Sequence, residues 1–213
     1  MRLAWALVVE VAAGDGGVGI VGDRQPRLRD GRLPIAVSLL LDGRVVAEHD
    51  RAPDVLGALA ESRHHVGLMR LLRRLAVTYR PPTGFLRDIV VEHGGEHRGR
   101  FNVKRGGLLP IVDIARYAGA AAGATSTSTP DRLRAAADAG VLKEREAASL
   151  QEAFELFAEL RLEHQVGQLR AGEDPDDFLD PKALNPLTRR YVREAFRAVS
   201  ATQRALTNQI VYR

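Results

Sequence analysis

The 213-residue sequence contains no cysteine, few aromatic residues and no apolar run long enough to cross a bilayer. Without cysteine the chain has no disulfide bond and no thiolate nucleophile, as is usual in a reducing compartment. Aromatic residues make up 5% of the chain, too few to form a platform on which nucleic-acid bases stack. Glu10 interrupts the apolar run at the start of the sequence. We therefore expect a cytoplasmic protein with no membrane partner.

Lysine is scarce as well, because it occurs only at positions 104, 143 and 182, and arginine carries nearly all of the positive charge. The arginines are spread along the chain and alternate with acidic residues, which leaves a formal net charge of +4. This pattern is typical of a solvated surface with salt bridges, whereas a nucleic-acid-binding surface gathers its cations in one patch. We therefore do not expect nucleic acid among the partners.

Apolar residues recur at spacings of three and four over most of the sequence after residue 52, which is the period of an amphipathic helix. Thr129 and Pro130 are typical of a helix start, as cap and first helical residue, and Gly140 is typical of its end. Antiparallel packing is the natural way to bury so many apolar stripes. The sequence thus predicts a mainly α-helical fold, an antiparallel helical bundle, with helices over residues 52–80, 108–122, 130–139, 142–169 and 186–212.

A small β element is expected beside these helices. The apolar run after Pro34 favours a short buried strand within residues 34–46. Asp42 and Gly43 could form a hairpin turn; alternatively the strand continues, which places Asp42 and Arg44 on one face. Two β-prone runs around a glycine-rich turn predict a hairpin within residues 88–103.

Two cations, Lys104 and Arg105, precede the adjacent glycines Gly106 and Gly107, and an apolar helical pattern begins directly after them. Adjacent glycines let backbone N–H groups turn toward a ligand, and a helix start adds unpaired donors and a positive dipole end. This combination suits an anion, either a phosphate group or an acidic protein surface. The alternative interpretation is a basic turn that only leads into a helix.

Polar residues continue the apolar stripe of the helix predicted over residues 142–169. Burying such groups without partners costs on the order of 1–3 kcal/mol each, so they mark either a buried network or a binding site. With three charged residues of the two preceding helices, two of which are three positions apart and can pair, they form a predicted cluster lining a groove between helices. The alternative is an internal salt-bridge network that fixes helix register. The cluster comprises Asp113, Arg116, Arg132, Arg161, His164 and Gln165.

His93, Glu96 and His97 lie in a predicted loop and could be mistaken for a metal site. A metal site needs at least a third well-placed ligand, and loop histidines without one are usually only polar. We therefore predict no metal ligands in this chain.

Four separated stretches resemble one known family, in the same order along the chain. They are RPPTGFLRDIVVEHGGEHRGRFNVKRGGLLPIVDIAR (80–116), STPDRLRAAADAGVL (128–142), RLEHQ (161–165) and DDFLDPKALNPLTRRYVREAFRAVSATQ (176–203). They are similar to the putative nucleotidyltransferase substrate-binding domain. In that family the domain follows a nucleotidyltransferase domain similar to that of the PII uridylyltransferases, often with CBS or cyclic-nucleotide-binding modules further upstream. The resemblance implies that residues 51–213 are the helical substrate-binding domain and residues 1–50 a remnant of the nucleotidyltransferase domain.

The stretch IAVSLLLDGRVVAEHD (35–50) is similar to the last strand of that catalytic domain, where the family shows an apolar run, Asp, any residue and Arg. The resemblance implies that Asp42 stands in the place of the third catalytic carboxylate and that Arg44 follows it. The family has a bulky residue where this chain has Gly43.

Nucleotidyl transfer of this kind uses an Asp-x-Asp pair after a Gly-Ser turn, with a third carboxylate, to hold two Mg²⁺ ions. Residues 1–41 contain neither Gly-Ser nor Asp-x-Asp. A single carboxylate at Asp42 cannot build such a site. The resemblance therefore implies Mg²⁺ and a nucleoside triphosphate for an intact relative, whereas we expect this chain to bind no cofactor and to be inactive alone.

The expected function is that of a substrate-binding domain related to the [protein-PII] uridylyltransferases, with a role in signal transduction. Its expected partners are a catalytic nucleotidyltransferase chain or a PII-like signalling protein. The alternative, from a different functional class, is a non-catalytic signalling or scaffold module that binds a partner protein.

Overall fold

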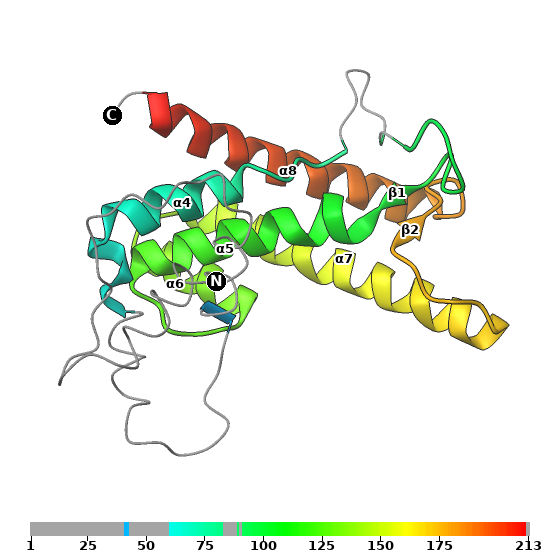
Figure 1. The fold of residues 1–213 in the computed structure, drawn as a ribbon, viewed down its shortest axis with the longest axis horizontal. Helices are drawn as coiled ribbons and strands as arrows, with labels where there is room; N and C mark the ends of the chain where they lie inside the picture. Colours follow the sequence, from blue (N-terminus) through cyan, green and yellow to red (C-terminus); the bar gives the residue numbers. More distant parts are fainter. Residues whose placement is uncertain (1–40, 43–59, 83–88, 90, 212–213) are drawn as a thin grey trace, which may run out of the picture. The chain divides into compact units, whose positions relative to one another are not determined.

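The structure, a computed structural model, describes residues 41–42, 60–82, 89 and 91–211. The chain divides into two compact units, one of residues 1–75 and 115–142 and the other of residues 76–114 and 143–213. One of the three boundaries along the chain, between residues 114 and 115, falls inside helix α5 (Leu109–Ala122). The described residues are mainly helical, with one two-stranded antiparallel sheet, as the sequence predicted (Figure 1).

The first unit contains the short 3₁₀ helix η1 (Ser62–His64), helix α4 (Val66–Ala76) up to Leu75, the second part of α5, and helix α6 (Thr129–Asp138). Of the helix predicted over residues 52–80, α4 is confirmed, but the backbone is extended at His65 and is no longer helical over residues 77–80. Residues 43–59 lie outside the described part. The apolar stripe of α4 faces a small core, which also includes one residue of the helical pair 41–42. This core comprises Leu41, Leu71, Leu72 and Ala120, with Leu68, Met69, Leu75 and Tyr117 packed around it.

Helix α6 begins one residue earlier than predicted. Ser128, and not Thr129, is the N-cap: its backbone is extended and its Oγ accepts a hydrogen bond from the Asp131 N–H group at 3.4 Å. Thr129 already has helical backbone, with Pro130 behind it in the first turn. Serine and threonine have the same capping chemistry, so the sequence could not separate the two neighbours.

The second unit is built on two long helices, α7 (Glu144–Ala171) and α8 (Pro186–Val211), which run antiparallel and pack along each other (Figure 1, yellow and orange to red). Three buried aromatic rings form the centre of its core. Phe157 of α7 stacks on Phe196 of α8 with 4.9 Å between ring centroids, and Phe101 meets Phe196 edge to face at 5.7 Å. These contacts place Phe157 of α7 and Phe196 of α8 in a common core, whereas Leu187 and Tyr191 near the start of α8 are exposed.

The sheet pairs two segments that are far apart in sequence. Strand β1 (Phe101–Asn102) is antiparallel to β2 (Phe178–Leu179), with Phe101 opposite Leu179. The predicted glycine-rich turn is present over residues 92–100, where the Glu92 N–H group donates to the Arg100 carbonyl at 2.8 Å. β1 pairs with β2. Sequence reasoning did not predict β2, because a strand of two residues is too short to show a period.

The strand predicted within residues 34–46 is wrong for its two described residues, because Leu41 and Asp42 have helical backbone. A short apolar run reads alike as a buried strand or as a buried piece of helix, and here Leu41 packs against helices of the first unit. The remainder of that run, Arg44 included, lies outside the described residues, as does the predicted domain boundary at residue 50. Among the described helices, none is both long and apolar enough to span a membrane.

Candidate functional site

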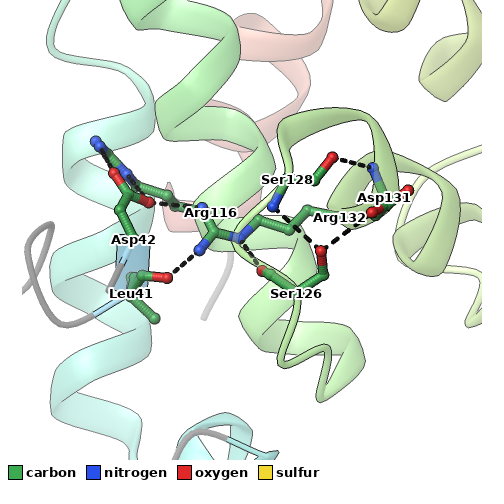
Figure 2. Close-up of polar contacts among 7 residues, drawn as sticks. All are labelled: Leu41, Asp42, Arg116, Ser126, Ser128, Asp131 and Arg132. Atoms are coloured by element: carbon green, nitrogen blue, oxygen red, sulfur yellow. Dashed lines mark hydrogen bonds and ion pairs between the residues drawn. The ribbon is translucent and has the colours of Figure 1, made fainter. Parts of the chain in front are cut away.

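Asp42 forms ion pairs with two arginines, one from α5 and one from α6 of the first unit (Figure 2). The Nε of Arg116 donates to Oδ1 of Asp42 at 3.2 Å, and its Nη2 donates to Oδ2. The Nη1 of Arg132 also donates to Oδ1, at 2.8 Å, and its Nη2 donates to the Leu41 carbonyl. The two arginine side chains are only 13% and 4% exposed, whereas the Asp42 side chain is 38% exposed. Arg116 and Arg132, the arginine pair, thus form a buried receptor for one carboxylate.

The guanidinium group of Arg132 is positioned by the loop between α5 and α6. Its Nε donates to the Ser126 carbonyl at 2.7 Å. Its aliphatic stem lies against Gly119 of α5, where a Cβ atom would be 2.8 Å from Cγ of the arginine. Because no larger residue fits between them, the glycine is what allows the buried arginine to pass α5 and reach Asp42.

The charge state of Asp42 follows from these contacts. Partial burial raises the pKa of the Asp42 carboxyl, but the hydrogen bonds and positive charges of Arg116 and Arg132 lower it by more. Its pKa therefore lies below the ordinary value, and the group is ionised at neutral pH. The assignment of Asp42 as a remnant of the third catalytic carboxylate stays a prediction, and its oxygens here accept from guanidinium groups.

A second polar network lies in the second unit, at the end of α7. Arg161 donates from Nε to Oδ1 of Asp177 at 2.6 Å, and the side-chain amide of Gln165 donates to the same oxygen at 3.2 Å. His164 Nε2 lies 2.7 Å from Oδ1 of Asp176. Gln165 also donates to the Asp176 carbonyl at 3.3 Å. Three residues of α7 thus fasten the segment that leads into β2.

Asp176 also organises its own loop. Its Oδ1 accepts from the Phe178 N–H group at 2.8 Å, and its own N–H group donates to the Gln168 side chain at 2.9 Å. Partial burial raises the pKa of Asp176, but hydrogen bonds from His164 and the Phe178 backbone lower it by more, so the carboxylate form is favoured. The ionised side chain therefore holds α7, the loop and the start of β2 together.

This anchored strand in turn positions the basic turn that sequence analysis singled out. The Asp177 carbonyl accepts from the Val103 N–H group at 2.9 Å. The two residues before Val103 are strand β1, which pairs with β2. Asn102 then caps the next segment, because its Oδ1 accepts from the Arg105 N–H group at 2.7 Å. Residues Lys104–Leu108 form a π-helical turn, η2, that continues into α5. Single π turns are rare and often occur at functional sites.

The adjacent glycines of this turn are explained by packing. Gly106 and Gly107 are buried and helical. A Cβ atom on Gly106 would lie 2.7 Å from Cδ of Pro82, and one on Gly107 would lie 2.7 Å from Cγ of the Phe157 ring. Glycine is therefore required here whether or not a ligand binds, and the predicted approach of a ligand to this backbone stays a prediction.

Four cations are exposed along the turn and the loop before it: Arg98, Arg100, Lys104 and Arg105. Among the described residues, none of these side chains forms an ion pair or a side-chain hydrogen bond. Two of the four lie at the start of a helical segment, where the helix dipole is positive and added cations are unfavourable. This basic segment, residues 98–105, therefore combines unpaired charge with a helix start, and an anion would stabilise both.

The structure places the ten predicted binding residues at four locations. The arginine pair meets Asp42 in the first unit, whereas Arg161, His164 and Gln165 meet Asp176 and Asp177 in the second. Lys104, Arg105 and the two glycines form the basic turn, and Asp113 is buried in α5. In both networks these side chains pair with carboxylates of the same chain. Ligand binding by these residues, and the Asp113–Arg116 pair, stay predictions.

Two residues of the site were missed from sequence, Asp176 and Asp177. A signal was available, because Asp-Pro-Asp-Asp follows the helix whose polar stripe lacked partners. His97, considered above for a metal site, stacks its ring on Phe178 with 3.6 Å between centroids. No group of three or more metal-ligating side chains occurs in the part of the chain that the structure describes.

Comparison with known proteins identifies one family. The family model described as "Putative nucleotidyltransferase substrate binding domain" matches residues 67–210, about two-thirds of the chain. No curated protein and no solved structure matches the sequence. The matched range includes the arginine pair, the second polar network with its α7 and loop residues, and the basic segment. Leu41 and Asp42 lie before the matched range.

Proposed function

The chain belongs to the family of putative nucleotidyltransferase substrate-binding domains, and we propose that it binds the anionic substrate of a nucleotidyl-transfer reaction through the basic segment. The substrate class is a nucleoside triphosphate or an acceptor with an acidic or phosphorylated surface. In this proposal the carboxylates that perform the transfer belong to a separate catalytic domain or chain.

The observation that supports this most strongly is the anchoring of the basic segment. Lys104 and Arg105 are exposed and unpaired among the described residues, yet the backbone that carries them is held by Asn102, by β1 and β2, and by the Asp177 carbonyl. Unpaired cations on an ordinary surface are usually mobile, and they lose entropy when they bind. Cations on an anchored backbone lose less, and lysine and arginine are the residues that bind phosphate in proteins.

The proposal is tested by isothermal titration of the full chain with UTP and with ATP, each with and without Mg²⁺. The double variant Lys104→Ala, Arg105→Ala is expected to weaken nucleotide affinity at least tenfold, because two charge-assisted contacts are lost. The matched control is Arg190→Ala with Arg204→Ala, two exposed arginines of α8 that remove the same charge. An equal loss of affinity in both double variants would mean that only net charge matters, which contradicts the proposal.

The proposal that this chain binds substrate but does not perform the transfer is based on its carboxylates. A two-Mg²⁺ site needs several converging carboxylate oxygens. Residues 1–41 contain no Asp-x-Asp, and the described residues do not fit Mg²⁺ at Asp42, since both of its oxygens accept from arginines. We therefore propose that the chain alone does not transfer nucleotides. Magnesium-dependent transfer of radiolabel from a nucleoside triphosphate to any acceptor by the purified chain alone would contradict this.

A related proposal concerns the partner. We propose, from the resemblance to domains that follow nucleotidyltransferases similar to the PII uridylyltransferases, that the partner is a catalytic nucleotidyltransferase chain or a PII-like signalling protein that acts as acceptor. Titration of this chain with a candidate catalytic chain, with and without UTP and Mg²⁺, separates two outcomes. Binding that requires nucleotide supports a composite enzyme, whereas nucleotide-independent binding supports the alternative of a scaffold module.

A further inference from the structure

At the arginine pair, the side chains that donate hydrogen bonds are buried, whereas the carboxylate that accepts them is partly exposed. The Arg132 side chain is 4% exposed and Asp42 is its charged partner among the described residues, because its other hydrogen bonds go to the carbonyls of Ser126 and Leu41. A buried guanidinium group without an anion is strongly unfavourable. The site therefore requires a negative charge at all times, but the group that supplies it, Asp42, is 38% exposed.

The side chain of Arg132 is held in place by contacts that do not involve Asp42. The Ser126 carbonyl fixes Nε of Arg132, and the gap at Gly119 fixes its stem. Ser126 belongs to the loop that Ser128 closes when it caps α6. These contacts all come from α5, α6 and the loop between them, so the Arg132 guanidinium group keeps its orientation if the carboxylate leaves.

The family model covers the two arginines of this contact but not the aspartate. Arg116 and Arg132 lie inside the matched range, residues 67–210, whereas Asp42 lies 25 positions before its start. The domain itself thus carries the receptor, and the anion comes from the segment that precedes the domain. The carboxylate occupies the receptor through three donor groups, and phosphate, with more oxygens, suits the forked donors of two arginines at least as well.

We propose that the arginine pair is a phosphate-binding site that Asp42 occupies in cis, and that a ligand phosphate group binds there by displacing Asp42. Binding then releases residues 41–42 from the arginine pair. The site is independent of the basic segment, which lies in the other unit, and either proposal can fail alone.

Thermal unfolding of the full chain with Asp42→Ala tests this, with inorganic phosphate as the probe and sodium chloride at equal ionic strength as the reference. In chloride the variant is expected to melt below the wild type, because the buried guanidinium group of Arg132 loses the carboxylate to which it donates. Phosphate at ten times its dissociation constant is expected to raise the melting temperature of the variant by about 3–6 °C. The wild type, in which phosphate must displace Asp42, is expected to bind at least tenfold more weakly.

Two further variants keep the test decisive. Asp42→Asn keeps the shape of the side chain, so it reports on the receptor if the alanine variant does not fold. Asp138→Ala is the matched control, since it removes an exposed carboxylate of α6 that has no described partner, and phosphate should not stabilise it selectively. If phosphate stabilises neither Asp42 variant more than chloride does, the proposal is wrong. If Lys104→Ala, Arg105→Ala in the Asp42→Ala background abolishes the phosphate effect, the effect arises at the basic segment and the proposal is also wrong.

Discussion

Replacing Gly107 by alanine tests whether the glycine pair of the basic turn is required for packing. Gly107 lies in the π-helical turn, and its missing side chain leaves room for the Phe157 ring. An alanine Cβ would lie 2.7 Å, 2.9 Å and 3.0 Å from three ring carbons. Contacts of that length do not occur in folded proteins, so either the ring or the turn must move.

The cost of this movement follows from what surrounds the ring. Phe157 is fully buried and stacks on Phe196, so the ring has no free direction in which to shift. Overpacking in a well-packed core costs up to about 3 kcal/mol. Alanine in place of glycine in a helix returns about 1 kcal/mol through its higher helix propensity. We expect Gly107→Ala to reduce the free energy of unfolding by about 2 kcal/mol and the melting temperature by about 4–8 °C.

Urea and thermal unfolding, followed by circular dichroism, measure this change. Gly167→Ala is the matched control, because Gly167 is a helical, exposed glycine of α7 with no atom within 4 Å of its Cβ position. This control is expected to stabilise the chain by about 0.5–1 kcal/mol. An unchanged or raised stability of Gly107→Ala would refute the packing argument. If that variant also lost nucleotide binding, the glycine pair would instead serve ligand approach.

Three other changes probe the second unit. Asp177→Asn removes the charged partner of an α7 arginine and should cost about 1–3 kcal/mol in urea unfolding, whereas Asp174→Asn in the same loop, exposed and without a described partner, should cost less than about 0.5 kcal/mol. The pKa of Asp176 is lowered in the folded state, so its stabilising contact with His164 is complete above pH 3.8, the ordinary pKa of an aspartate, and is lost as pH falls through the folded pKa. Asp176→Asn should therefore flatten the acid limb of a plot of stability against pH. An unchanged acid limb would contradict a stabilising role of the ionised Asp176 side chain. Gln203→Ala removes a buried amide that donates to two backbone carbonyls at and after the end of α4, at 2.9 Å and 2.6 Å; hydrogen exchange and urea unfolding should show a loss of about 1–3 kcal/mol, and a neutral result would mean that water replaces the amide.

Helices were the most predictable part of the fold, because their signal is local. The stripes of α5, α7 and α8, and the threonine and proline at the start of α6, are periodic or positional features that can be read from neighbouring residues. Errors occurred where the signal was short. Leu41 and Asp42 continue an apolar run that suits strand and helix equally, and β2 has two residues.

The candidate site was only partly predictable, since residue types are local and partners are not. Arg161, His164 and Gln165 were recognised as polar groups in need of partners, but Asp176 and Asp177 become their partners only through the turn that follows α7. The sequence left two interpretations of the glycine pair open, ligand approach or a turn into a helix, because nothing in it places the Phe157 ring against these residues.

The sequence by itself determined the helical fold class, the family, and which polar residues could not remain unpaired, because periodicity, motif order and the cost of burying a charge do not depend on the partner. Tertiary structure alone decided which anion each cation meets. It joined Asp42 to arginines 74 and 90 positions away and left Lys104 and Arg105 facing solvent. The physical reason is that an ion pair depends on the distance between two groups in space, and that distance is set by the packing of helices around Gly119 and Phe157 and not by separation along the chain.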